Sequence, residues 1–312
     1  MMAERNQRVV FGQTLVELCR ENKDIVVLDA DLGGSTMGKM VELEPGMEER
    51  HIEMGIAEAN MLSTAAGLAR VGKIPFACSF AVFSAGRAYD QIRQTIAIGR
   101  LNVKICGSSA GCSDFGDGAT HQSVDDIAYL RVIPNMSVFV PADANETKAV
   151  VNYMAAHEGP MYIRLNRNPY DNVTPENAEF VPGEPVVLRD GTDVTVFACG
   201  IMGAKALEAA EKLDGKISVR VVNVPSIKPL NRESVIRLSK DVKGVVTAEE
   251  HSIIGGLGGA VAEALRLERI PVEFVGIEDR FGSSAHSYDD ILNYLGLTAD
   301  HIAEAVGKIS SL

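Results

Sequence analysis

Residues 53–90 read EMGIAEANMLSTAAGLARVGKIPFACSFAVFSAGRAYD. The small residues predict a helix that begins at Glu58, and the apolar run after them predicts a buried strand that ends at Phe80, with Phe83 just beyond it. A single carboxylate beside two aromatic rings suits a flat heterocyclic ligand that needs one ring nitrogen hydrogen-bonded and its faces covered. The alternative is that Glu58 serves only the dipole of its own helix.

Apolar strands and amphipathic helices alternate through the whole chain. The predicted strands cover residues 25–28, 75–80, 103–106, 137–140, 161–165, 194–198, 219–223, 244–248 and 272–277. The predicted helices cover residues 8–21, 58–69, 87–98, 143–157, 202–213, 231–238 and 258–267, with a short one after Ser123 and a final one capped by Thr298. This alternation predicts the α/β class, with two open, mostly parallel α/β sheet domains. Residues 166–185 carry four prolines and no periodicity, which indicates a linker. We therefore divide the chain into residues 1–168, a linker at 169–185, and residues 186–312.

The composition excludes several classes of protein. Among 312 residues, 46% are hydrophobic and 23% are charged, which is typical of a globular protein. A net charge of −12 argues against a nucleic-acid partner, because binding to phosphates requires a basic surface. No apolar run approaches the roughly 20 residues of a membrane span. The first residues lack the apolar core of a signal peptide, so we expect a cytoplasmic location.

The cysteines show no pattern of a disulfide framework or a zinc site. They form no CxxC pair, and most of them lie in or near apolar runs. We predict buried free thiols at Cys19, Cys78, Cys106, Cys112 and Cys199.

Polar and aromatic residues follow several of the predicted strands. In open α/β sheets, ligands bind beyond the carboxyl ends of the strands. The residues placed there are Asp31, Ser35, Phe80, Phe83, Asp117 and His121. They are therefore candidates for one shared rim, although an aspartate after a strand is about as often a simple turn or cap residue.

Five stretches occur in an order that carries a family resemblance. They are GIAEANM at 55–61, SFAVF at 79–83, GDGATHQ at 116–122, PADANE at 141–146 and DRFGSSAHSYDDIL at 279–292. Together they resemble the pyrimidine-binding and C-terminal domains of transketolases, over nearly the whole chain from about residue 7. The resemblance implies a thiamine-diphosphate pyrimidine-binding domain followed by a transketolase C-terminal domain.

The N-terminal domain of that family has no counterpart in these stretches. The resemblance thus implies the C-terminal subunit of a split, two-chain transketolase that transfers a two-carbon ketol unit from a ketose or ketose phosphate to an aldose or aldose phosphate. Its cofactors would be thiamine diphosphate and Mg²⁺, with the Mg²⁺ ligands on the partner chain. The partners would be an N-terminal transketolase subunit, a second copy joined through the pyrimidine domains of a heterotetramer, and small sugar substrates.

The resemblance also assigns roles to individual residues. Glu58 matches the catalytic carboxyl that bonds the aminopyrimidine ring, and we expect it in an apolar, closed site. Residues matching the cofactor site are Glu58, Phe80, Phe83 and Asp31, and residues matching the substrate site are Ser35, Asp117, His121 and Arg167. Where many members carry a third aromatic residue this chain has Gly86, which predicts a more open pocket. Arg164 is expected to be structural.

Two departures concern the substrate. Ser109 stands where longer transketolases have a histidine, and Val9 stands where they have a phosphate-binding arginine, with Arg8 one position away. Loss of these groups predicts weaker binding of phosphorylated sugars. The substrate therefore need not be the usual pentose phosphate.

Other motifs are assigned no chemistry. GDG with Asn145 mimics a magnesium motif, but this GDG lies within a long loop and not directly after a strand, so we predict no metal ligand in this chain. The glycines at 255–259 resemble a phosphate loop and are interpreted as packing residues, and His251 and His286 as structural. His51 matches no role in the family pattern.

Two other functions remain open at this stage. One is the beta subunit of a 2-oxoacid dehydrogenase decarboxylase component, which has a similar two-domain plan. The other is a non-catalytic assembly subunit. Retention of Glu58, Phe80 and Phe83 argues against the second.

Overall fold

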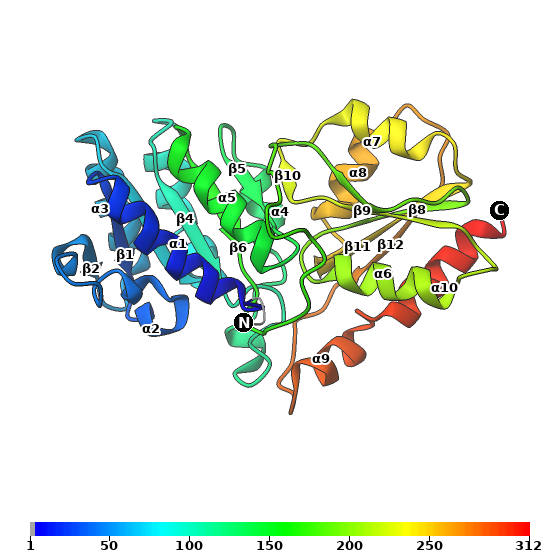
Figure 1. Ribbon diagram of the computed structural model, residues 1–312, viewed down its shortest axis with the longest axis horizontal. Coiled ribbons are helices and arrows are strands. Elements are labelled where there is room, and N and C mark those ends of the chain that lie inside the picture. Colours follow the sequence, from blue (N-terminus) through cyan, green and yellow to red (C-terminus); the bar gives the residue numbers. More distant parts are fainter. Residues whose placement is uncertain (1–3) are drawn as a thin grey trace.

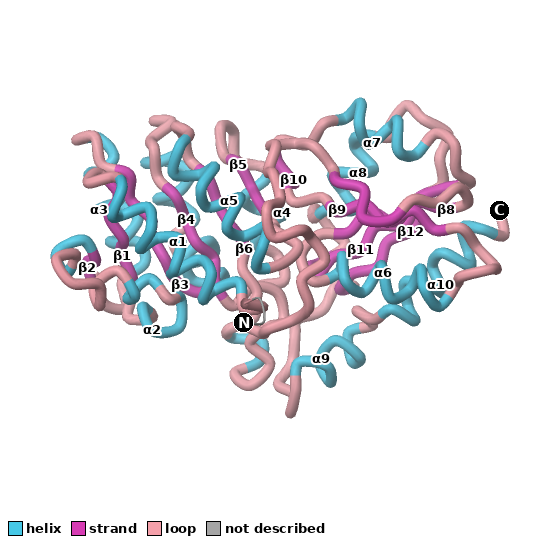
Figure 2. The backbone as a smooth tube through the Cα atoms, viewed as in Figure 1, coloured by secondary structure: helices cyan, strands magenta, loops and turns pink. Residues whose placement is uncertain are grey.

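Two mostly parallel β-sheets flanked by helices make up the structure, a computed structural model that describes residues 4–312. The seven-stranded sheet has the order β10-β5-β6-β4-β3-β1-β2, and the five-stranded sheet has the order β12-β11-β8-β9-β7. Only β10 with β5 and β7 with β9 pair antiparallel among the described strands. Figures 1 and 2 show the two sheets side by side along the long axis, which confirms the predicted fold class.

The first half of the chain surrounds the seven-stranded sheet, to which the second half adds β10. Its strands are β1 (Ile25–Asp29), β2 (His51–Glu53), β3 (Ile74–Phe80), β4 (Lys104–Ser108), β5 (Ser137–Phe139), β6 (Met161–Arg164) and β10 (Ser226–Lys228). Its helices are α1 (Gln7–Glu21), α2 (Gly33–Thr36), α3 (Glu58–Arg70), α4 (Asp126–Arg131) and α5 (Ala144–Ala156). Apolar side chains of α1 and α5 cover one face of the sheet, and those of α3 and α4 cover the other.

The second half surrounds the five-stranded sheet. Its strands are β7 (Val186–Arg189), β8 (Val194–Ala198), β9 (Val219–Asn223), β11 (Gly244–Ser252) and β12 (Val272–Ile277). Its helices are α6 (Met202–Lys212), α7 (Arg232–Ser239), α8 (Leu257–Ala264), α9 (Tyr288–Leu295) and α10 (Ala299–Ser310). None of the helices in the described part of the chain is long and apolar enough to cross a membrane.

The chain between β6 and β7, residues 165–185, contains neither helix nor strand, as expected for a linker. The second half of the chain nevertheless contributes one strand to the first sheet. β10 follows β9 in the sequence but pairs with β5 at the edge of the first sheet. The domain boundaries proposed from the sequence stay a prediction, and the sheets themselves do not divide cleanly at the linker.

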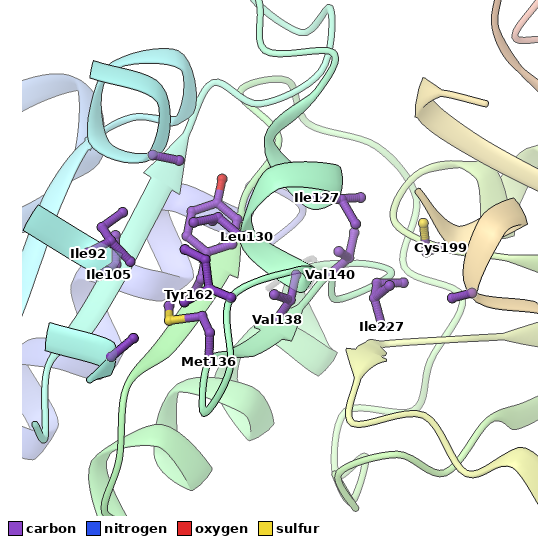
Figure 3. Packing of buried hydrophobic residues seen from close by; sticks show 14 of the residues in the cluster. Ile92, Ile105, Ile127, Leu130, Met136, Val138, Val140, Tyr162, Cys199 and Ile227 are labelled. Atoms are coloured by element: carbon purple, nitrogen blue, oxygen red, sulfur yellow. The ribbon is translucent and has the colours of Figure 1, made fainter. Parts of the chain in front are cut away.

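One continuous apolar cluster contains residues of both halves. Ile127 and Val140 from the first half and Ile227 and Cys199 from the second belong to it, each exposed by 2% or less (Figure 3). Separating the halves would expose this apolar surface to water, which is unfavourable. All five cysteines are buried and free, as predicted.

A buried polar network crosses the same boundary. The Arg164 guanidinium donates to the Asp126 carboxylate at 2.9 Å and to the Glu250 carbonyl at 2.8 Å. The Tyr162 hydroxyl also donates to Asp126, at 2.7 Å. The Glu250 side chain in turn accepts hydrogen bonds from Asn166 and from the hydroxyl of Tyr288. Arg164 is therefore structural, as expected.

One segment of the first half differs from the expectation. The helix predicted over residues 87–98 begins at Ala81 and contains π-helical turns at Val82–Arg87 (η3) and Gln91–Ala97 (η4). Phe83 therefore projects from a helical turn and not from the end of a strand. The sequence pattern also missed β2, β7, β10, α2 and α9. Four of these are elements of three or four residues, which gain their order from long-range contacts more than from local periodicity.

The glycine-rich turn at residues 255–259 opens α8. The buried Glu249 carboxylate accepts the backbone N–H of Leu257 at 2.7 Å and of Gly258 at 2.8 Å. These are the donors that a bound phosphate would use at a helix N-terminus. A Cβ on Gly256 would lie 1.9 Å from Glu249 Oε2, so the glycine allows this close approach. The packing interpretation is confirmed.

Gly256→Ala should lower the free energy of unfolding by about 1–3 kcal/mol, because the added methyl group overlaps the Glu249 carboxylate. Gly259→Ala is the matched control. Its Cβ would meet only Arg131 Nη1, at 3.7 Å, so it should be neutral or stabilise the helix by roughly 0.5–1 kcal/mol. Urea unfolding of both variants measures the difference, and equal effects would contradict this role for Gly256.

Candidate functional site

The parallel register brings the carboxyl ends of four strands to one edge of the first sheet. Asp29 on β1 lies opposite Cys78 on β3, and Phe80 at the end of β3 lies opposite Ser108 on β4. Gly107 on β4 lies opposite Arg164 on β6. The loops that follow these strands therefore open on a shared rim, as parallel topology requires.

Glu58 lies beside this rim as the first residue of α3. Its side chain is only 2% exposed, and both carboxylate oxygens lie 3.0 Å from Arg87 Nη1. The Arg87 side chain is half exposed, so it lies between Glu58 and the solvent. This differs from the apolar, closed surroundings expected for Glu58, because η3 directs a charged partner at the carboxylate and offsets the cost of burying it.

An aromatic cluster lies next to this ion pair. The rings of Phe80 and Phe83 stack with centroids 6.2 Å apart, and the His121 ring meets them edge-on at 6.3 and 5.3 Å. The Arg87 guanidinium carbon lies 4.4 Å from the Phe83 ring centroid. Arg87 therefore joins Glu58 to the aromatic cluster, and the chemically distinctive residues of the segment 53–90 form one continuous site.

The opening expected at Gly86 is partly filled from another element. A Cβ on Gly86 would lie 3.3 Å from the hydroxyl oxygen of Tyr129, which comes from α4. The Tyr129 ring packs edge-on against Tyr89, with centroids 6.0 Å apart. A tyrosine distant in sequence thus borders the position where the chain lacks a local aromatic residue.

Two arginines form the cationic end of the rim. Arg167 pairs with the buried Asp114 carboxylate, and its guanidinium carbon lies 6.0 Å from the Phe80 ring centroid. Arg8 Nη1 donates to the Ser35 carbonyl at 2.7 Å. Burial and the nearby charge of Arg167 lower the pKa of Arg8 to about 10, against the opposing effect of Asp114.

The position of Arg8 bears on the cations expected at this end of the rim. Val9 was expected to leave the phosphate end of the site short of one cation. Arg8 in the first turn of α1 instead places its guanidinium near that of Arg167, because the helix begins one residue before it, at Gln7. Two guanidinium groups at this rim suit an anionic group of a ligand.

The remaining candidates are less closely connected. Asp31 is exposed with φ +58°, and its backbone N–H donates to Glu53 Oε1 at 2.7 Å. Asp117 is exposed, and its carboxylate has no hydrogen-bond partner among residues 4–312. Ser109 is fully buried, and its hydroxyl is likewise without a partner among the described residues. The structure therefore brings Glu58, Phe80, Phe83, His121 and Arg167 into one chain of contacts, and leaves Asp31 and Asp117 outside it.

The donor set of the rim decides which ligands it can hold. Among residues 4–312, no group of three or more His, Cys, Asp or Glu side chains is placed to hold a metal ion. Asn145 instead donates to the Thr174 carbonyl at 2.8 Å and fixes the linker. A buried carboxylate beside stacked phenylalanines fits an aminopyrimidine, whose ring nitrogen and faces need those groups.

Three residues of this site have no individual signal in the sequence. They are Arg87, Asp114 and Tyr129. Arg87 follows Phe83 by four residues, a spacing that would have placed both on one helical face had the helix been predicted to begin at Ala81. Asp114 and Tyr129 come from loops and helices far from the residues they contact.

Comparison with known proteins places both halves of the chain in families. Residues 3–172 match the pyrimidine binding domain of transketolase, and residues 183–302 match the transketolase C-terminal domain. A putative transketolase C-terminal section from Methanocaldococcus jannaschii is 44% identical over 309 residues, covering 97% of this chain and 95% of that protein. The 6-deoxy-6-sulfo-D-fructose transketolase subunit SqwH of Clostridium sp. is 42% identical, covering 97% of this chain and 94% of its own length.

The fold is also similar to a solved structure. A split gene transketolase, described as an inactive beta4 tetramer, superposes with a TM-score of 0.89 at 48% sequence identity. The match covers 99% of this chain and 99% of that chain. The similarity therefore includes both sheets and the linker between them.

Arg87→Met should lower the free energy of unfolding by about 1–3 kcal/mol, because it leaves the Glu58 carboxylate buried without a partner. The control is Arg93→Met, at an exposed arginine of the next helical turns, which should change stability by less than about 0.5 kcal/mol. Adding Glu58→Gln to Arg87→Met should recover part of the loss. Equal destabilisation by the two arginine variants in urea unfolding would show that the pair contributes nothing.

Proposed function

The chain belongs to the transketolase family, and we propose that it is the C-terminal subunit of a two-subunit, thiamine-diphosphate-dependent transketolase. The reaction is transfer of a two-carbon ketol unit from a ketose to an aldose. The observation that carries the proposal is the buried Glu58 carboxylate beside the stacked Phe80 and Phe83 rings. These groups recognise a pyrimidine, while the described residues include no cluster suited to a metal.

Thiamine diphosphate, when bound, would supply the nucleophilic carbon and the electron sink that ketol transfer requires. Within this chain, Glu58 holds a proton at the pyrimidine ring nitrogen through one carboxylate oxygen. Phe80 and Phe83 stack against the ring and exclude water from it. In this proposal, at least one hydrogen bond from Arg87 to Glu58 weakens when the pyrimidine binds, because Arg87 Nη1 contacts both carboxylate oxygens in the chain alone.

The substrate end of the site is assigned to the residues at the other part of the rim. Arg8 and Arg167 bind an anionic group at the far end of the sugar, and Ser35 orients Arg8 through its carbonyl. His121 and Asp117 bind sugar hydroxyls. One relative is named for 6-deoxy-6-sulfo-D-fructose, a sugar with an anionic end, which supports a charged ketose as the substrate of this chain.

The partner chain completes the site in this proposal. It is an N-terminal transketolase subunit that brings the diphosphate and Mg²⁺ ligands. Two copies of the present chain associate through their pyrimidine-binding domains, where Ile56 lies 75% exposed two residues before Glu58. The related beta4 tetramer supports self-association, and its inactive state is what a subunit without its partner should show.

The isolated chain should have no ketol-transfer activity and should gain it when mixed with an N-terminal transketolase subunit that carries a strand-linked GDG motif. In the mixture, Glu58→Gln should reduce kcat by a factor on the order of 10²–10⁴, the usual effect of losing a proton-transfer group. Glu21→Gln, at an exposed carboxylate that ends α1, is the matched control and should leave kcat unchanged.

Three results of this assay would point elsewhere. Activity of this chain alone would exclude a split site. Full activity of the Glu58→Gln mixture would indicate a non-catalytic assembly subunit. Decarboxylation of a 2-oxoacid in place of ketol transfer would indicate a dehydrogenase beta subunit.

Phe83→Leu should weaken thiamine diphosphate binding to the assembled pair roughly 3- to 10-fold, since it removes aromatic stacking against the pyrimidine. Phe139→Leu makes the same change in β5, where the ring is 1% exposed and packs against Tyr153 and Phe180. That variant should lose stability without losing affinity. Calorimetric titration with the cofactor separates the two, and equal affinities would remove Phe83 from the cofactor site.

A further inference from the structure

His51 is a buried histidine with a carboxylate at each ring nitrogen. Its side chain is 2% exposed. Nε2 lies 3.3 Å from Asp29 Oδ2, and Nδ1 lies 3.2 Å from Glu42 Oε2. A neutral imidazole has one N–H and can donate to only one carboxylate, whereas an imidazolium donates to both. In the structure Nε2 is placed for a hydrogen bond to Asp29, and Nδ1 lies within ion-pair distance of Glu42, so the two carboxylates favour the doubly protonated ring.

Residues 33–38 pack tightly against the ion pair of His51 and Asp29. The Thr36 hydroxyl donates to Asp29 Oδ1 at 2.9 Å, and the Gly38 N–H donates to Thr36 Oγ1 at 3.2 Å. A Cβ on Gly38 would lie 2.3 Å from Asp29 Oδ2, and one on Gly33 would lie 3.3 Å from His51 Nε2. Glycines at both ends of residues 33–38 thus let the backbone approach the ion pair closely.

The same segment reaches the substrate side of the rim. The Ser35 carbonyl, next to Thr36, accepts the hydrogen bond from Arg8 Nη1 at 2.7 Å. Arg8 in turn lies close enough to Arg167 for the two charges to interact. A short chain of contacts therefore runs from His51 through Asp29 and Thr36 to the cationic end of the site.

We infer that His51 is a positioning residue, held as an imidazolium between Asp29 and Glu42, that fixes residues 33–38 and through Ser35 the guanidinium of Arg8. The clamp is a property of the chain alone, and its effect on substrate binding rests on the proposed function. His51 touches neither the proposed cofactor nor the proposed substrate site directly. It acts through the segment that it holds.

The charges around His51 determine how the clamp responds to pH. Burial lowers the pKa of His51, but Asp29 on β1, Glu42 in the loop before β2 and Glu53 on β2 itself outweigh it and raise the pKa above its ordinary value. Burial raises the pKa of Asp29, against the hydrogen bonds from His51 and Thr36. Lys39 also lies beside this segment, and its Cβ is 3.1 Å from the position of a Cβ built on Gly33.

The sign of the pH effect follows from the raised pKa. Stability gained from a histidine with a raised pKa is fully present below its unfolded value, near 6.5, and is lost as the pH rises through the folded value. The clamp should therefore hold below about pH 6.5 and loosen as the pH rises through the raised pKa of His51. Loosening should release residues 33–38 while the aromatic cluster keeps its geometry.

The first test is NMR titration of the full-length chain labelled at its six histidines, with His51→Gln used to assign the signal. His51 should titrate above about 6.5, and Glu42→Gln should lower that midpoint because it removes one carboxylate. Glu42 is 41% exposed, so this variant should fold. The exposed His286 serves as the control and should not move. A midpoint of His51 below 6.5, or one unchanged in Glu42→Gln, would overturn the imidazolium clamp.

The second test measures amide hydrogen exchange of residues 33–38 in the same samples, corrected for intrinsic exchange rates. Protection should fall about tenfold as the pH rises through the His51 midpoint, the loss expected for one charge-assisted hydrogen bond. In His51→Gln the protection should be low at every pH. Protection that is independent of both pH and His51 would contradict the clamp.

The third test uses the complex with the partner subunit and a phosphorylated ketose. KM should rise about tenfold through the His51 midpoint while cofactor affinity stays constant, and His51→Gln should show the high KM throughout. A flat KM in the active wild-type complex would remove the positioning role. Absence of any ketol transfer would refute the proposed function instead, and the clamp would then be judged by the two tests on the chain alone.

Discussion

The buried ion pair between Arg164 and Asp126 is the interaction on which the arrangement of the rim depends. Arg164 ends β6, Asp126 begins α4, and the same guanidinium donates to the backbone of Glu250 in the second half. Burial lowers the pKa of Arg164, but Asp126 and Glu250 outweigh it, so the guanidinium stays charged. Removing one partner of such a pair typically costs about 3–5 kcal/mol, because the other charge is left uncompensated. The pair therefore fixes three segments around one point.

This point lies directly beneath the functional rim. Arg164 is followed within three residues by Arg167. The intervening Asn166 donates its backbone N–H to Gln7 Oε1 and its side-chain amide to Glu250 Oε2. Gln7 begins the helix that carries Arg8. The cationic end of the site is thus built on the boundary between the two halves, so the second half contributes to the site without supplying the side chains that would contact a ligand.

The two ends of the rim are held by different means. At the heterocycle end, Glu58 and Phe83 come from consecutive helical segments, α3 and η3, and are tied together by Arg87. At the cationic end, Arg8 and Arg167 come from opposite ends of the first half and are placed by the segment at 33–38 and by Asp114. The side chains at one end of the rim are therefore positioned by local structure, and those at the other end by long-range packing.

Local sequence patterns were enough to predict the two mostly parallel α/β sheets and to group Glu58, Phe80 and Phe83 as candidates for one site, because strand and helix periodicity and ordered motifs are local properties of the chain. The long-range contacts that this reasoning missed are the pairing of β10 with the first sheet, the ion pair of Arg87 with Glu58, and the proximity of Arg8 to Arg167. These features depend on which side chains meet across tens of residues, and on where a helix begins to within one turn. No local pattern encodes either, since both follow from packing the two halves around one buried charge.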